Sequence, residues 1–138
     1  MVNNKKKIND MDFTSPDVLN WLQSAAGDAI DALPFGVIAM DVDGQTRIYS
    51  DYESRQAQLS RDEVLNRRFF EHVAPCMNNL MVAGRFADAR QASVPLDAVI
   101  DYVIAFRAQV VEAKLRLLYA PGVSLHYLLI QRVSGTSA

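Results

Sequence analysis

The stretch that decides the fold is "PFGVIAMDVDGQTRIYS", residues 34–50. Its first half holds a short apolar run with β-branched residues, Val37 to Met40. Its second half, "QTRIYS", has the composition of a returning strand. Between them "DVDG" is a turn signal, because aspartate and glycine suit the backbone angles of tight hairpin turns. The stretch therefore predicts a β-hairpin over residues 35–50.

The last third of the chain is also strand-like. Three segments are rich in β-branched and aromatic residues and alternate at least in part between apolar and polar positions. They are "LDAVIDYVIAF" at 96–106, "VVEAKLRLLYA" at 110–120 and "VSLHYLLIQRV" at 123–133. With the hairpin they give five strands.

The remaining segments favour helices. "SPDVLNWLQSAAGDAI" at 15–30 predicts a helical cap that packs on another element, with Ser15 as its N-cap. Ser60 and Glu63 have the spacing of a capping box. Residues 78–93 predict a further helix, with an apolar face near Leu80, Met81, Ala83, Gly84 and Ala87. This order predicts an α+β domain, an antiparallel sheet with helices on one side. We divide it into a tail and helical cap, 1–32, and a domain, 33–138.

Composition narrows the classes of function. The chain has 138 residues, enough for one domain, and a net charge of −2, which does not favour nucleic acid or an anionic membrane as partner. A single cysteine cannot form an internal disulfide. No apolar run is long enough to span a bilayer, and the N-terminus has no secretion signal, so we expect a cytoplasmic protein.

The cysteine, Cys76, lies in the segment "FFEHVAPC", residues 69–76. Taken alone, such a residue is more often a small buried hydrophobe than a functional thiol. His72 stands four residues before it, but two histidines and one cysteine in the whole chain make a metal site improbable. No catalytic triad, phosphate loop or carboxylate pair is detectable, so we expect no enzyme activity and no metal.

Several segments resemble the photoactive yellow protein family, blue-light receptors of the PAS-domain group. They are "LPFGVIAMDVDGQTRIYS", "FFEHVAPC", "GRF" at 84–86 and the ending "LLIQRV", at the family's spacing apart from about one extra residue near 94–97. The resemblance covers nearly the whole chain from Leu33. It implies a PAS-like fold, a five-stranded antiparallel sheet flanked by helices with an N-terminal helical cap.

The resemblance also implies a cofactor. The family carries p-coumaric acid (4-hydroxycinnamic acid) as a thioester on the cysteine that matches Cys76. Its phenolate is held by a tyrosine and a protonated glutamate, which match Tyr49 and Glu53. Light isomerises the cofactor, the glutamate gives up its proton, and the N-terminal cap loosens. Burial beside an anion raises a carboxyl pKa, which agrees with an acid that keeps its proton.

Further pocket positions follow from the same comparison. Phe69, Phe70 and Pro75 could supply the apolar wall and the tight backbone path around Cys76. Ile104, Phe106 and Ala108 fall at positions that line the family's pocket. Ala57, Leu59 and Ala108 replace a threonine, an arginine and a methionine of the family. With fewer polar partners for the phenolate, we expect a higher phenol pKa and, without the methionine, slow dark recovery.

The leading hypothesis is a photosensor, a monomer or weak homodimer whose conformational change is read by an unknown downstream signalling protein. Two alternatives remain open. The first is a PAS-type interaction module without a chromophore. The second is a thiol redox sensor or acyl carrier at Cys76, for which His72 is the one candidate base.

Overall fold

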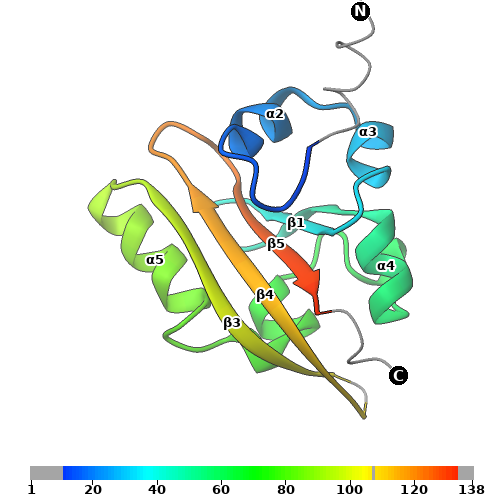
Figure 1. Ribbon diagram of the computed structural model, residues 1–138. Coiled ribbons are helices and arrows are strands. Elements are labelled where there is room, and N and C mark those ends of the chain that lie inside the picture. Colours follow the sequence, from blue (N-terminus) through cyan, green and yellow to red (C-terminus); the bar gives the residue numbers. More distant parts are fainter. Residues whose placement is uncertain (1–10, 107, 134–138) are drawn as a thin grey trace, which may run out of the picture.

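A five-stranded antiparallel sheet in the order β2-β1-β5-β4-β3 forms the centre of the computed structural model, which describes residues 11–106 and 108–133 (Figure 1). Along the chain the elements are α2 (Val18–Ser24), α3 (Gly27–Asp31), β1 (Gly36–Met40), β2 (Thr46–Tyr49), α4 (Asp51–Ala57), the short turns η1 (Arg61–Glu63), η2 (Phe69–Val73) and η3 (Pro75–Met77), α5 (Ala83–Ala92), β3 (Leu96–Phe106), β4 (Gln109–Tyr119) and β5 (His126–Arg132). Within the described ranges, no helix is long and apolar enough to cross a membrane.

The predicted strands are confirmed. The hairpin β1–β2 and the three long strands lie where the sequence places them, and the five-stranded α+β architecture is the expected one. The capping box at Ser60 and Glu63 is also present, on the short turn η1.

The N-terminal helix differs from its prediction. Residues 15–30 form two short helices because the backbone is extended at Ala25 and Ala26. The first helix begins only at Val18. The hydroxyl of Ser15 instead accepts a hydrogen bond from the backbone N–H of Asp12, 3.0 Å away.

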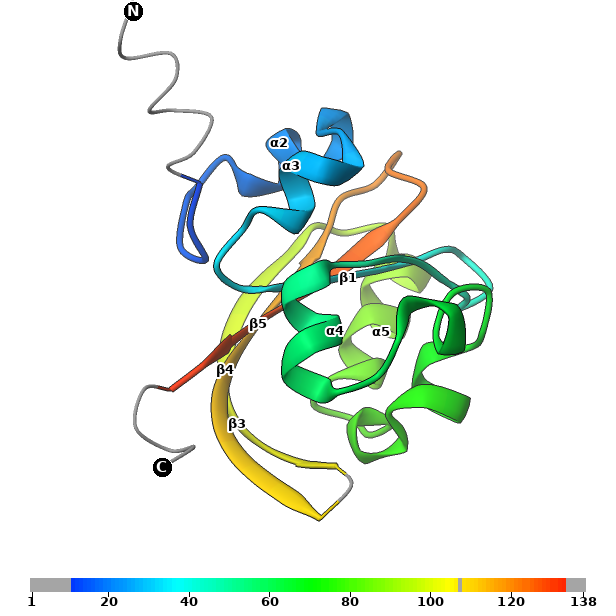
Figure 2. The same cartoon turned by 90° about the vertical axis from the view of Figure 1, so that its right-hand side faces the viewer.

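Helices cover both faces of the sheet, not the one face expected from the sequence (Figures 1 and 2). In β1, Ile38 and Met40 pack in one cluster with residues of η2 and α5. The alternate residues Val37 and Ala39 pack in a second cluster, with residues of the N-terminal segment. Because both faces of β1 are buried, this strand is apolar at every position from Val37 to Met40 rather than alternating.

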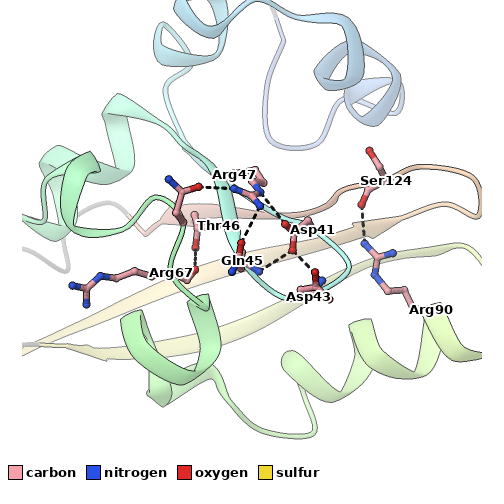
Figure 3. A network of polar contacts seen from close by, with 9 residues as sticks. Asp41, Asp43, Gln45, Thr46, Arg47, Arg67, Arg90 and Ser124 are labelled. Carbon is pink, nitrogen blue, oxygen red and sulfur yellow. Dashed lines mark hydrogen bonds and ion pairs between the residues drawn. The ribbon is translucent and has the colours of Figure 1, made fainter.

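The hairpin turn is fixed by the side chain of Asp41 (Figure 3). Its Oδ1 accepts hydrogen bonds from the backbone N–H groups of Asp43, at 2.9 Å, and Gln45, at 3.0 Å. Its Oδ2 accepts from Nε of Arg47, at 2.8 Å. Gly44 has a φ of 82°, which glycine adopts without strain. The turn, together with a bulge between Ala39 and Met40, sets the register that brings Tyr49 opposite Ile38.

Arg116 of β4 ties the N-terminal segment to the sheet. Its guanidinium binds both carboxylate oxygens of Asp97 at 2.9 Å, and its Nη1 donates to the carbonyls of Phe13 and Ser15, also at 2.9 Å. The Arg116 side chain is only 6% exposed, so these partners replace water almost completely.

Replacing Arg116 by methionine should therefore leave two carbonyls without their donor. We expect the free energy of unfolding to fall by about 2–3 kcal/mol and residues 13–31 to exchange backbone hydrogens faster. Lys114→Met is the matched control, since Lys114 is on the same strand as Arg116 but forms an exposed ion pair with Asp101 of β3. Equal effects of the two substitutions on urea unfolding would contradict this role of Arg116.

Helix α5 begins later than predicted and turns a different face to the core. The Asn79 side chain accepts hydrogen bonds from the N–H groups of Met81 and Val82 just before the helix starts. Phe86 and Ala89 are buried. Leu80, which the sequence places on the apolar face, is 87% exposed.

His126 of β5 is buried beneath α5. Its ring lies 4.5 Å from the ring of Phe86, and its Nδ1 accepts hydrogen bonds from Nε and Nη2 of Arg90 at 3.1 and 2.8 Å. Burial, with a contribution from the Arg90 charge, lowers the pKa of His126 from 6.5 to about 4. The folded protein thus holds this imidazole neutral.

This depressed pKa predicts a loss of stability in acid. Between pH 6.5 and about 4 the unfolded chain binds a proton at His126 that the folded chain does not. The contribution of neutral His126 to the free energy of unfolding is therefore complete above pH 6.5. It falls by about 3 kcal/mol as the pH drops to 4. Urea unfolding of the wild type and His126→Gln at pH 7 and pH 4 measures it. A difference between the two proteins that does not change with pH would contradict the assignment.

Candidate functional site

The candidate site is a small pocket between α4, the turns η2 and η3, and strands β3, β4 and β5. It is half open to solvent, and its cavity has a volume of about 40 Å³. Its wall is largely apolar, with a thiol, a carboxylate and a guanidinium among the lining groups. The lining residues are Glu53, Gln56, Ala57, Phe69, Val73, Ala74, Cys76, Met77, Ile104, Phe106, Gln109, Val111, Ile130 and Arg132.

Cys76 is held by its backbone. Pro75 occupies the first position of η3, where its fixed φ suits a helical turn. The carbonyl of Cys76 accepts hydrogen bonds from the hydroxyl of Tyr102, at 2.7 Å, and from Nδ2 of Asn79, at 3.3 Å. The edge strand β3 therefore fixes the residue that carries the thiol.

The thiol of Cys76 is half-buried. Burial raises the pKa of Cys76, although a hydrogen bond from the backbone of Ala105 opposes the rise. A redox sensor needs a thiolate at neutral pH, which calls for a lowered pKa. His72, the candidate base for that alternative, is exposed and lines a separate hollow. These features do not favour the redox-sensor alternative.

A buried ion pair forms the polar end of the pocket. Nη1 and Nη2 of Arg132 donate to Oε1 and Oε2 of Glu53 at 2.8 and 2.9 Å. The two side chains are 13% and 5% exposed. Burial raises the pKa of Glu53, while Arg132 opposes the rise. Because both carboxylate oxygens accept from a guanidinium, Glu53 is ionised in this arrangement.

Two residues set the position of the Glu53 carboxylate. Ser50 is the N-cap of α4, and its hydroxyl accepts from the backbone N–H groups of Glu53, at 3.4 Å, and Val37, at 3.0 Å. Gly36 of β1 has no side chain, and this leaves room for the Glu53 carboxylate. A Cβ at this position would overlap Oε1 of Glu53 and lie 3.2 Å from its Cδ.

Gly36→Ala should consequently push the carboxylate away from Arg132. We expect the free energy of unfolding to fall by about 2–4 kcal/mol, since the change overpacks the core and disturbs a buried ion pair. Gly27→Ala is the control, because a Cβ there meets nothing within 4 Å. Thermal unfolding of both variants checks this. If the Gly36→Ala protein is as stable as Gly27→Ala, the Glu53 carboxylate does not depend on the room left by Gly36.

The structure brings together part of the predicted site. Cys76, Glu53 and Phe69 line the pocket, as do Ile104 and Phe106. Three other predicted residues do not line it. Phe70 packs against the rings of Phe69 and Phe86, and Pro75 is exposed. Tyr49 is buried in the same cluster as Phe69 and lies near enough to Arg132 to raise the pKa of that guanidinium.

Two of the three replaced positions also lie apart from the pocket lining. Ala57 lines the pocket, but Leu59 is buried next to the separate hollow that His72 lines. Ala108 is an exposed residue of the β3–β4 turn with a φ of 65°. The expectation of slow recovery from a missing side chain at Ala108 therefore has no support from its position.

Sequence reasoning missed Arg132, Gly36 and Tyr102. Arg132 could have been found, because the alternation of β5 puts it on the same face as the core residues Leu128 and Ile130. A glycine inside a strand, such as Gly36, is a signal of close approach by another group. The bond from Tyr102 to Cys76 spans 26 positions and has no local signal.

Comparison with known proteins assigns the family. Photoactive yellow protein of Rhodothalassium salexigens is 27% identical over 121 residues, which are 88% of this chain and 96% of that protein. The crystal structure of the photoactive yellow protein domain from the sensor histidine kinase Ppr of Rhodospirillum centenum is 30% identical. The match has a TM-score of 0.74 and covers 81% of this chain and 97% of that domain.

The chain belongs to the photoactive yellow protein family. Its Cys76, Glu53 and Phe69 thus line one pocket in a photoactive yellow protein fold. The fold extends to the wider PAS group, since a PAS domain of an HTR-like protein from Haloarcula marismortui matches with a TM-score of 0.56 at 14% identity and covers all of that domain. No family model matches the sequence.

No metal site is apparent in the part of the chain that the structure describes. Within residues 11–106 and 108–133, no three histidine, cysteine, aspartate or glutamate side chains gather as a metal would require. The chemistry of the pocket rests on its thiol and its buried ion pair.

Proposed function

We propose that this protein is a blue-light photosensor that carries p-coumaric acid as a thioester on Cys76. The observation that carries the proposal is the shared pocket of Cys76, Glu53 and Phe69 in a member of the photoactive yellow protein family. When bound, the group would supply absorption of blue light and a double bond that isomerises. The protein would act as a sensor and not as an enzyme.

The residues of the pocket suit such a group. Apolar side chains of Phe69, Val73, Met77, Ile104 and Ile130 would surround its ring and vinyl carbons. The Arg132 guanidinium and the Glu53 carboxyl would face its oxygen end. Because the cavity of about 40 Å³ is small for an aromatic ring with its acyl chain, we expect attachment to displace side chains of the wall. Gln56 and Gln109 are the exposed long side chains of the wall and are the best placed to move.

The protein's own residues would carry the signal outward. The carbonyl of Cys76 is hydrogen-bonded to Tyr102 of β3, and Arg132 belongs to β5. Both strands extend beyond the pocket, and β5 also contacts the N-terminal segment through Leu129. We propose that a change at the pocket alters how the N-terminal helices pack, and that a downstream signalling protein reads that change.

Attachment is the first thing to measure. Incubation with an activated p-coumaroyl thioester should transfer the acyl group to the Cys76 sulfur, with release of the donor thiol. Because Cys76 is the one cysteine of the chain, intact mass should rise by a single acyl group. Cys76→Ala is the matched control and should stay unmodified. The modified protein should absorb blue light, which the control should not.

The outcome also separates the alternatives. A wild-type protein that folds but keeps its unmodified mass would reject the photosensor and favour an interaction module without a chromophore. Acylation without a change of the absorption spectrum on illumination would favour an acyl carrier.

A further inference from the structure

We propose that Arg132 is the counter-cation of the ligand's phenolate. When the ligand binds, the guanidinium releases the Glu53 carboxylate and holds the phenolate instead. The inference rests on the proposed function and assigns the charge that neutralises the buried anion. Arg132 is the last residue of β5, and its side chain lines the pocket together with Glu53 of α4.

The geometry of Arg132 suits this role. A guanidinium has five N–H donors, and Glu53 engages two of them, one on Nη1 and one on Nη2. Arg132 lines the same cavity as Cys76, so a group attached to the thiol shares its space with the guanidinium. A planar, permanently charged donor is also the side chain best able to hold a buried oxygen anion.

Charge in the pocket explains why the exchange is needed. Among the lining residues that the structure describes, Glu53 and Arg132 are the charged ones, and they neutralise each other. The other titratable groups near Arg132 are Tyr49 and Tyr52, which influence its pKa, and the Cys76 thiol in the lining. None of these three groups is a carboxylate or a basic side chain. A phenolate added to the intact pair would leave one uncompensated negative charge in an apolar site.

Proton transfer removes that charge. If the ligand enters as the neutral phenol, its O–H bond breaks and an O–H bond forms on a Glu53 carboxylate oxygen. Arg132 then neutralises the phenolate, and the total charge of the pocket stays constant. Burial already raises the pKa of Glu53, and loss of the Arg132 hydrogen bonds removes the opposing effect. The acid would therefore keep the proton it receives.

This assignment changes an expectation from the sequence. The loss of polar partners at Ala57 and Leu59 predicted a poorly stabilised phenolate and a higher phenol pKa. A guanidinium within the pocket acts in the opposite direction, because a nearby cation favours the ionised form. With Arg132 as counter-cation, the bound phenol should be ionised at neutral pH.

The test uses protein acylated with p-coumaric acid, with attachment verified by intact mass. The phenol ionisation constant is then measured by pH titration of the absorption spectrum in the wild type, Arg132→Gln, Arg132→Lys and Glu53→Gln. We expect Arg132→Gln to reduce the constant at least tenfold and Arg132→Lys to restore most of it. The control is Arg55→Gln, which removes an exposed cation of α4 and should change little.

A second readout follows the proton. Infrared spectra of the wild type should show a protonated carboxyl band after acylation that is absent before it and absent in Glu53→Gln. A carboxyl that is already protonated before acylation would overturn the exchange.

The outcomes distinguish this inference from the proposed function. No acylation of the folded wild type rejects both. Acylation with the same phenol ionisation constant in Arg132→Gln and wild type rejects the inference alone. If Arg132→Gln does not fold, the double variant Glu53→Gln, Arg132→Gln takes its place in the titration, because it removes both charges of the buried pair at once. That variant should also show a reduced constant relative to Glu53→Gln, and equal constants would overturn the role of Arg132.

Discussion

Burial of strands β1 and β5 on both faces is the constraint on which the rest of the structure depends. Ile38 and Ile130 point into the cluster that contains the pocket, and Val37 and Leu129 point into the cluster beneath the N-terminal helices. Neither strand can move without disturbing both layers, because protein interiors are close-packed. The pocket and the N-terminal segment are therefore two sides of the same pair of strands.

Local patterns predicted most of the fold, because hairpin turns and strand alternation are encoded by neighbouring residues. The run from Val37 to Met40 gave the strand, and its lack of alternation could have shown that both faces are covered. The break at Ala25 and Ala26 was harder to foresee, since alanine suits a helix and only packing favours the extended backbone there.

The candidate site was predictable only in part, for a different reason. Cys76 and Glu53 were found through family spacing, whereas the partner of Glu53 lies 79 positions away on the last strand. Such a pairing has no local signature and depends on how the sheet is ordered. The resemblance implies two polar partners for the ligand, Tyr49 and Glu53. The structure adds a cation, Arg132, to this pocket.

Gly36 has a consequence for how this pocket can change over generations. Because a side chain there would occupy the place of the Glu53 carboxylate, substitutions at the two positions are not independent. If Glu53 is lost first, alanine or a larger residue at position 36 costs little stability. If Gly36 is replaced first, the new side chain displaces the Glu53 carboxylate and destabilises the protein. Once that space is filled, restoring the glutamate alone no longer restores the site. In this chain, Gly36 thus makes the loss of the acid easier to fix than to reverse.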